Sequence, residues 1–165
     1  RQRELVKNAL RMRPDRIILG EIRGGEAIDM IAAMSSGCEG SLATVHANNS
    51  RDALARFETM VGIGMPNMTP RTIRETIARA LDLVVQQSRL SDGTRRVTSI
   101  TEVSGREGDV IIPQDIFVFV IKPVDGTGRV RGRFVATGVR PRFLTKLRQY
   151  GINVPPDVWD FSKEV

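Results

Sequence analysis

The sequence predicts an α/β fold with a parallel sheet first and antiparallel strands added later. Residues 17–45 show a strand–helix–strand pattern, and such a βαβ unit implies parallel strands joined by a right-handed crossover. Residues 82–103 show a hairpin pattern, which joins antiparallel strands. The chain has 165 residues, 41% of them hydrophobic. It is therefore long and apolar enough for one domain, or for one lobe of a larger one.

The βαβ unit follows a predicted helix over residues 2–13, whose helical apolar spacing stops before Pro14. The continuous apolar run Ile17–Leu19 is typical of a strand buried on both faces. Residues 25–36 predict a helix, and Leu42–Val45 predict the second strand. The inward stripe of that helix is expected at Ile28, Ile31, Ala32 and Ser35, with Gly37 as its stop.

Two further helices are expected before the hairpin. Ser50 can cap a helix that runs to about Val61, and Thr69 can cap another with Pro70 at its first position. Their buried residues are expected to be Leu54, Phe57, Val61, Ile73, Ile77 and Leu81.

The later part of the chain predicts antiparallel strands and a closing helix. Asp92-Gly93 is a turn signal between the first two of these strands. The strands are expected at 82–90, 95–103, 115–121 and 129–135, and the helix at 141–150.

The net charge of +6 is concentrated towards the two ends of the chain. Residues 129–148 contain seven basic side chains and no acidic ones, whereas residues 17–128 sum to −3. Such a basic stretch can meet nucleic acid or an anionic membrane. With one Trp and one Tyr there is little aromatic material for base stacking, so a solvated face is favoured and nucleic acid is not expected as a partner.

Several classes of site are excluded by composition. The single cysteine, Cys38, excludes an intramolecular disulfide framework and a cysteine-based zinc cluster. No apolar stretch approaches the ~20 residues that span a bilayer. The phosphate-binding loop G-x-x-x-x-G-K-[ST] occurs nowhere, so the chain can contribute to a nucleotide site but cannot hold the triphosphate alone.

Two polar residues follow the two predicted parallel strands directly. Glu21 comes after the first and His46 after the second, at the strand ends that line ligand crevices in α/β sheets. Glu21 can order a water, bind Mg²⁺ through water or act as a general base; the alternative is a solvated carboxylate. His46 is the only histidine and lies in the polar stretch 44–49, which favours a phosphate-facing role over a packed histidine.

The turn after the first strand offers a second group of candidates. Arg23 presents a rigid guanidinium fork suited to phosphate, and Gly24-Gly25 allows close approach of a ligand or subunit. The alternative is a simple strand-to-helix turn with a surface pair between Arg23 and Glu26. Arg56 and Arg11, taken singly, are interpreted as solvated helix residues.

Taken together, these motifs resemble the type II/type IV secretion system ATPase superfamily. Residues 10–23 are similar to its Walker B segment, and residues 40–49 to its His box at the matching spacing. The combination most resembles the branch that assembles tight-adherence (Flp-type) pili. The resemblance continues through residues 51–60, 100–103, 114–117 and 132–141.

The resemblance implies a RecA-like P-loop ATPase core with helices on the sheet faces. It implies a motor that uses ATP and Mg²⁺ as a cytoplasmic homohexamer, peripheral at the inner membrane, where it drives a membrane platform protein. Residues 1–121 would then be the later part of the motor domain, and 122–165 a basic extension with the closing helix. Glu21 would organise Mg²⁺ and the attacking water, His46 would face the γ-phosphate, and Arg23 would neutralise phosphate charge.

The resemblance also implies that Arg56, Thr44 and Arg11 contact the nucleotide or a neighbouring subunit. The family's Walker A loop would lie before Arg1, as would its N-terminal domain with arginine fingers. The isolated chain is therefore expected neither to bind ATP tightly nor to hydrolyse it. Two alternatives stay open: a conjugative DNA-transfer ATPase of the same superfamily, and a non-catalytic assembly module.

Overall fold

The computed structural model describes residues 2–122 and 128–160, which form two compact units. The first unit contains the chain up to Leu81 together with Gly105–Ile112. The second contains Asp82–Ser104 and the chain from Pro113 onward. These units reflect packing, and the functional boundary expected after residue 121 stays a prediction.

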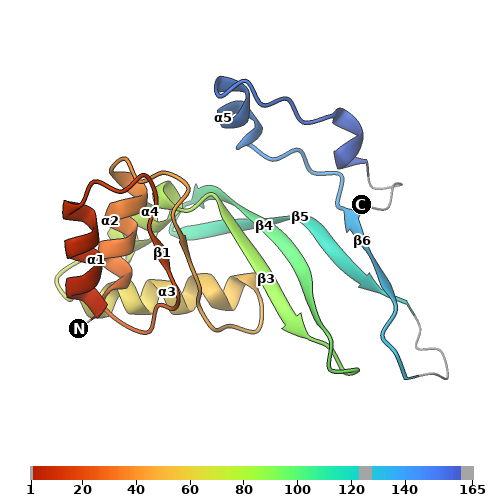
Figure 1. Ribbon diagram of the computed structural model, residues 1–165, viewed down its shortest axis with the longest axis horizontal. Coiled ribbons are helices and arrows are strands. Elements are labelled where there is room, and N and C mark those ends of the chain that lie inside the picture. The colour runs from red at the N-terminus through yellow and green to blue at the C-terminus, as the bar shows by residue number, and fades with distance from the viewer. Residues whose placement is uncertain (1, 123–127, 161–165) are drawn as a thin grey trace. The chain divides into compact units, whose positions relative to one another are not determined.

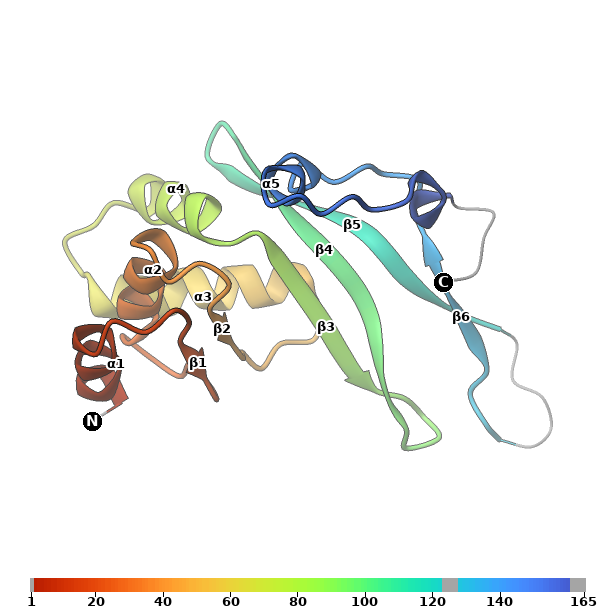
Figure 2. The same ribbon diagram turned by 45° about the horizontal axis from the view of Figure 1, so that its top comes forward.

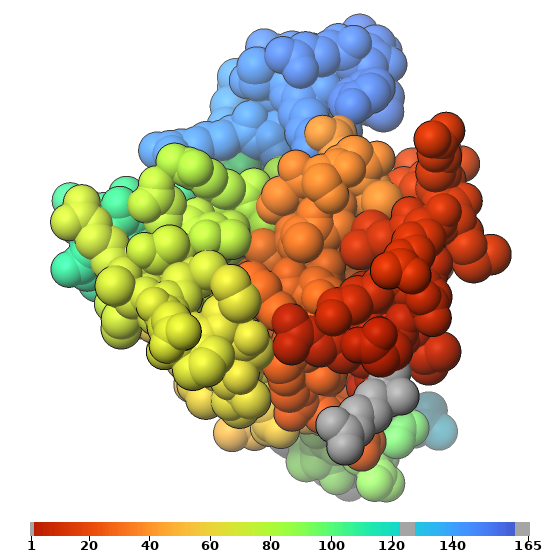
Figure 3. All heavy atoms as spheres, turned by 90° about the vertical axis from the view of Figure 1, so that its left-hand side faces the viewer, coloured from red at the N-terminus to blue at the C-terminus, as the bar shows by residue number. Residues whose placement is uncertain are grey.

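The first unit is a helical cluster beside a short parallel strand pair (Figure 1). Helix α2 packs against α1, α3 and α4, and these helices lie side by side in the first unit (Figure 3). The elements are α1 (Gln2–Arg11), β1 (Ile18–Leu19), α2 (Ala27–Ser35), β2 (Leu42–Ala43), α3 (Ser50–Gly64) and α4 (Pro70–Ala80).

The parallel βαβ unit is confirmed, but the expected burial of its strands is wrong. Ile18 pairs with Leu42 and Leu19 with Ala43 in parallel register. Ile18 is 76% exposed and Leu42 61% exposed, whereas Ile17 is buried. Within the described residues this sheet has two strands only, so no further strand flanks the pair. An apolar run alone does not show how many elements cover it.

The predicted inward stripe of α2 is also partly wrong. Ile31 is fully buried as expected, but Ala32 and Ser35 are exposed. Because α2 contacts three other helices, its buried arc is set by those neighbours and not by a single stripe. The buried residues of α2 are Ala27, Met30, Ile31 and Ala33.

Capping explains where α3 and α4 begin. Asn49, and not Ser50 as expected, is the N-cap of α3, because its side chain accepts from the Asp52 N–H at 2.8 Å. Thr69 caps α4 through the Thr72 N–H at 3.2 Å, with Pro70 in the first turn, as predicted.

The predicted inward faces of these two helices are largely confirmed. All but one of the expected residues are buried; Leu81 is half-buried at the cap beyond α4. The buried ones are Leu54, Phe57, Val61, Ile73 and Ile77.

The second unit is built on an antiparallel sheet in the order β3-β4-β5-β6. The antiparallel strands are confirmed, but they form a sheet of their own and are not added to the parallel pair. The strands are β3 (Leu83–Arg89), β4 (Arg95–Glu107), β5 (Val110–Ile121) and β6 (Gly132–Ala136). Strand β4 continues beyond its predicted end at residue 103, and β5 begins before its predicted start at residue 115. Residues Gly105–Ile112, which include the turn between these strands, belong to the first unit.

The described residues that follow β6 pack onto this sheet. Trp159 lies 5.6 Å from the ring of Phe117, which stacks on Phe134 at 5.7 Å. Buried Glu102 accepts from the Phe143 N–H at 2.9 Å, which fixes the approach to α5. Helix α5 (Leu144–Gln149) is shorter than predicted, and the 3₁₀ turn η1 (Pro156–Trp159) was not predicted. No helix among the described residues is long and apolar enough to cross a bilayer.

Candidate active site

The parallel pairing of β1 and β2 brings the two predicted strand-end residues together. Beyond the strands, the pairing continues as the Ile22 N–H donates to the Thr44 carbonyl at 2.9 Å. The Thr44 hydroxyl also donates to the Gly20 carbonyl across the pair. Glu21 and His46 therefore leave the same edge of the sheet side by side.

Glu21 lies between the side chains of Arg23 and His46. Its Oε2 is 2.6 Å from Nη2 of Arg23, and its Oε1 is 3.0 Å from Nε2 of His46. The Glu21 side chain is 22% exposed, whereas those of Arg23 and His46 are 74% and 77% exposed. The carboxylate is thus shielded while both partners stay accessible to an incoming anion.

These contacts stabilise the charged form of the carboxylate. The hydrogen bond from Arg23 lowers the pKa of Glu21 below its usual value, and the charges of Arg23, His46 and Arg56 add to this against the opposing effect of partial burial. The same pair raises the pKa of Arg23. Glu21 is therefore an acceptor at neutral pH, able to bind a cation or orient water.

Glu26 holds the turn that carries Arg23. Its Oε1 accepts the backbone N–H groups of Arg23 at 2.7 Å and Gly24 at 3.0 Å. Burial alone would raise the pKa of Glu26, but these N–H groups and its own hold it below the usual value. The surface pair between Arg23 and Glu26 is therefore not formed: Arg23 turns to Glu21 and Glu26 binds backbone.

Sequence reasoning missed one residue at this site. The Gln2 side chain donates through Nε2 to the Glu21 carbonyl at 2.5 Å, so α1 is tied to the strand end. No local pattern links positions 2 and 21, and only the packing of α1 beside α2 brings them together.

The remaining candidates divide by location. Arg56 on α3 acts on Glu21 through its charge, and Thr44 ties β2 to Gly20. Arg11 is the exposed last residue of α1 and is not among the groups that shift the Glu21 pKa. Asn49, part of the polar stretch around His46, is used for helix capping.

Residues 1–108 match the family model described as Type II/IV secretion system protein. This is well over half of the 165 residues. The chain belongs to this family. The part that matches contains Glu21, Arg23 and His46.

Named relatives agree with this family. The chain is 40% identical over 108 residues to a Mycobacterium tuberculosis protein provisionally named as a conjugal transfer protein, covering 66% of this chain and 30% of that protein. It is 39% identical over 109 residues to the type IV secretion system protein PtlH of Bordetella pertussis, covering 64% and 31%. The chain thus spans about a third of the length of these relatives.

A solved structure of the family has a similar fold. The VirB11 ATPase of the Brucella suis type IV secretion system, crystallised with sulphate, is 33% identical and superposes with a TM-score of 0.56. The similarity covers 60% of this chain and 31% of that one. This chain therefore has an α/β fold similar to that of the VirB11 ATPase.

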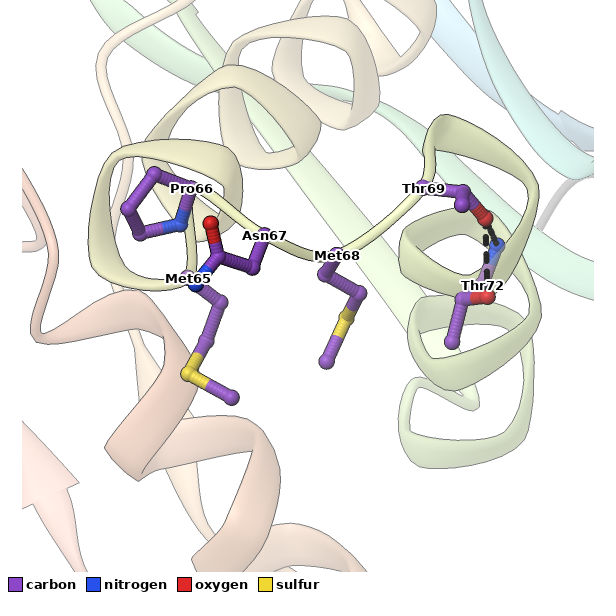
Figure 4. A pocket seen from close by; sticks show the side chains of 6 residues that line it. All are labelled: Met65, Pro66, Asn67, Met68, Thr69 and Thr72. Atoms are coloured by element: carbon purple, nitrogen blue, oxygen red, sulfur yellow. Dashed lines mark hydrogen bonds between the residues drawn. The ribbon is translucent and has the colours of Figure 1, made fainter.

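A pocket elsewhere in the first unit does not involve these residues. It has a volume of about 400 Å³ and lies at the α3–α4 connection, where Met65 and Met68 project towards the open space (Figure 4). Two of its lining residues, Thr69 and Thr72, form the α4 cap. It is lined by Met65, Pro66, Asn67, Met68, Thr69 and Thr72.

The cluster of Glu21, Arg23 and His46 has the side chains to bind a hydrated cation and a phosphate group. Among the described residues, no group of three or more His, Cys, Asp or Glu side chains forms a metal cage. Glu21 alone fits Mg²⁺ held mainly by water and phosphate oxygens, which is how that ion commonly binds. Arg23 and His46 carry N–H groups that can donate hydrogen bonds to phosphate oxygens.

Proposed function

We propose that this chain supplies the Walker B and His-box part of a motor ATPase that drives secretion or pilus assembly. The observation that carries the proposal is the cluster of Glu21, Arg23 and His46 at the ends of two adjacent parallel strands. Family membership supports ATP hydrolysis as the chemistry, and the VirB11 ATPase has a similar fold.

In this proposal each residue has a separate task. Glu21 holds hydrated Mg²⁺ and orients the attacking water, which its low pKa suits it to do. Arg23 leaves Glu21 to neutralise phosphate charge, and His46 leaves it to face the γ-phosphate, which the exposed positions of both side chains allow. When bound, Mg²⁺ offsets negative charge on the phosphates. Arg56, Thr44 and Arg11 are proposed contacts with nucleotide or a neighbouring subunit.

The assembly is proposed from the same resemblance. The motor would be a RecA-like homohexamer, peripheral at the cytoplasmic face of the inner membrane and coupled to a platform protein there. Residues 1–121 would belong to the motor domain and 122–165 to a basic extension. Because the phosphate-binding loop is absent from these residues, the triphosphate would be held by other parts of the site.

Two cargoes are proposed. The later motifs, at residues 100–103, 114–117 and 132–141, favour a tight-adherence pilus. The relatives named for conjugal transfer, which include TrbB of Rhizobium radiobacter, favour a conjugative machine equally. Salt-sensitive DNA binding by the full-length protein would favour the conjugative machine, because binding to phosphates releases counterions.

Replacing the proposed Walker B carboxylate tests the activity. In the full-length protein, Glu21→Gln should abolish ATP turnover and leave nucleotide binding largely intact, since the neutral amide cannot hold and orient the attacking water as the carboxylate does. Turnover is measured by phosphate release and binding by a fluorescent ATP analogue.

A matched control is Glu75→Gln on α4, which removes an equal charge from an exposed pair with Arg79. This control should hydrolyse ATP like the unmodified protein. Normal turnover by Glu21→Gln would show that the Walker B assignment is wrong.

A further inference from the structure

The topology of the second unit gathers cations that are far apart in the sequence. The β3–β4 turn and the far ends of β5 and β6 lie at the same end of the sheet in both views (Figures 1 and 2). Asp92 in the turn accepts the Val130 N–H at 2.9 Å, which fixes the two segments together. Seven exposed cations result: Arg89, Arg95, Arg96, Lys122, Arg129, Arg131 and Arg133.

One described carboxylate, Asp92, lies in the stretches 89–97, 118–122 and 128–134. It is already engaged, because the Thr94 hydroxyl and N–H donate to it at 2.7 and 3.0 Å in addition to Val130. These donors lower the pKa of Asp92 to about 2. Asp125 lies outside the described residues. Among the described residues, this end of the sheet therefore carries seven cations and one engaged carboxylate.

Three of the arginines share a sheet face. Arg89 and Arg95 are directly opposite each other across β3 and β4. Arg96, the next residue along, lies over the ring of Phe119 on the other face. Val120 follows Phe119 and so returns to the first face, where it is directly opposite Arg133. Like charges placed opposite each other destabilise a sheet, so an external anion would relieve a cost built into this face.

Exposed aliphatic side chains lie on the same face. Val97 is two residues from Arg95 and pairs with Gln87, while Val85 lies two residues before Gln87. Val85, Val97 and Val120 are 58%, 40% and 43% exposed. These valines and Arg89, Arg95 and Arg133 are called the arginine–valine face below.

We propose that the arginine–valine face binds an anionic lipid bilayer, an inference that rests on the membrane-peripheral location proposed above. Guanidinium groups pair with lipid phosphates, and each cation near such a surface strengthens binding. Burying exposed valines at the boundary between headgroups and acyl chains is favourable because it removes apolar surface from water. A nucleic-acid backbone is charged and polar, so contact with it does not bury the valines in this way. A nucleic-acid groove would carry aromatic rings for base stacking, and none of these six residues is aromatic.

Vesicle binding by the full-length protein tests the proposal. Vesicles of phosphatidylglycerol in phosphatidylcholine should sediment the protein, and vesicles of phosphatidylcholine alone should not. Arg95→Gln with Arg133→Gln should weaken binding about 25-fold, at about fivefold per cation. Some vesicle binding should persist at high salt, because salt does not screen apolar contact. Val97→Ser with Val120→Ser should weaken this salt-resistant part of the binding.

The control variant carries Arg51→Gln and Arg140→Gln, which remove equal charge from exposed positions outside this face. It should bind vesicles like the unmodified protein. Equal loss in both arginine variants, or a loss of DNA binding with unchanged vesicle binding, would overturn the proposal. ATP turnover without lipid should be unchanged in all variants, so failure here is distinguishable from failure of the ATPase proposal.

Discussion

Two carboxylates five residues apart have different tasks in the first unit. Glu21 contacts the side chains of Arg23 and His46, which remain accessible, whereas buried Glu26 accepts backbone N–H groups of its own turn. A ligand can replace the partners of Glu21, but the partners of Glu26 belong to the chain's own turn. Glu21 is therefore a candidate for chemistry, and Glu26 a positioning residue for Arg23.

Removing the Glu26 carboxylate should destabilise the protein. Glu26→Ala leaves the N–H groups of Arg23 and Gly24 without their acceptor, at a cost of about 1–3 kcal/mol in the free energy of unfolding. Because folding lowers the pKa of Glu26, its charge stabilises the fold above the unfolded value near 4.5, and this is lost as pH falls through the folded pKa.

Urea unfolding of the full-length protein across acidic pH checks this. Glu26→Gln keeps one oxygen acceptor without the charge, so its stability should fall less than that of Glu26→Ala and depend less on pH. Equal pH dependence in Glu26→Gln and the unmodified protein would contradict the assignment.

At the scale of elements, the turn before α2 lies directly against the end of α3. A Cβ on Gly64 would come within 2.5 Å of the Gly25 carbonyl oxygen and 2.9 Å of Ile28. The close approach that Gly24-Gly25 allows is therefore made by another part of the chain, the end of α3. It also connects α3 to the turn that carries Arg23.

Adding one methyl group at this contact should destabilise the fold. We expect Gly64→Ala to cost about 1–3 kcal/mol, as overpacking does elsewhere. Gly62→Ala is the matched control, because its Cβ would meet only Ile73 at 3.6 Å and alanine favours a helix by roughly 0.5–1 kcal/mol. Thermal unfolding compares them; a Gly64→Ala protein as stable as Gly62→Ala would contradict the close contact.

At the scale of the whole molecule, the first unit is discontinuous in sequence. Residues 105–112 join it from the tip of the β4–β5 hairpin. Arg74 on α4 accounts for part of this, since its Nε is 2.7 Å from Glu58 Oε1 and its Nη1 donates to the Asp109 carbonyl at 3.0 Å. One side chain thereby connects α3, α4 and the hairpin tip.

Loss of Arg74 should loosen the hairpin tip selectively. Arg74→Ala is expected to speed amide hydrogen exchange around Asp109, because the tip loses a hydrogen bond to α4 and keeps the longer, exposed pair between Arg71 and Asp109 at 4.0 Å. Arg79→Ala, which removes only an exposed pair with Glu75, should leave exchange there unchanged. Identical exchange in both variants would show that Arg74 does not hold the tip.

Local patterns predicted the elements well and their environments less well. The capping pattern at Thr69-Pro70 and the turn at Asp92-Gly93 depend on a few neighbouring residues, and both predictions are confirmed. The burial of Ile18 depended on which strands flank β1, and it was wrong. No periodicity within a segment contains that information.

Local sequence patterns were sufficient to predict the strand–helix–strand order, and with it the placing of Glu21 and His46 at adjacent strand ends. They also included the motifs that resemble the secretion ATPase family. Three features arise from tertiary packing alone: Arg23 turns to Glu21, the antiparallel strands form a separate sheet, and seven distant cations meet at its end. Strand order follows from local backbone preferences, whereas partners and shared faces depend on which distant segments pack together.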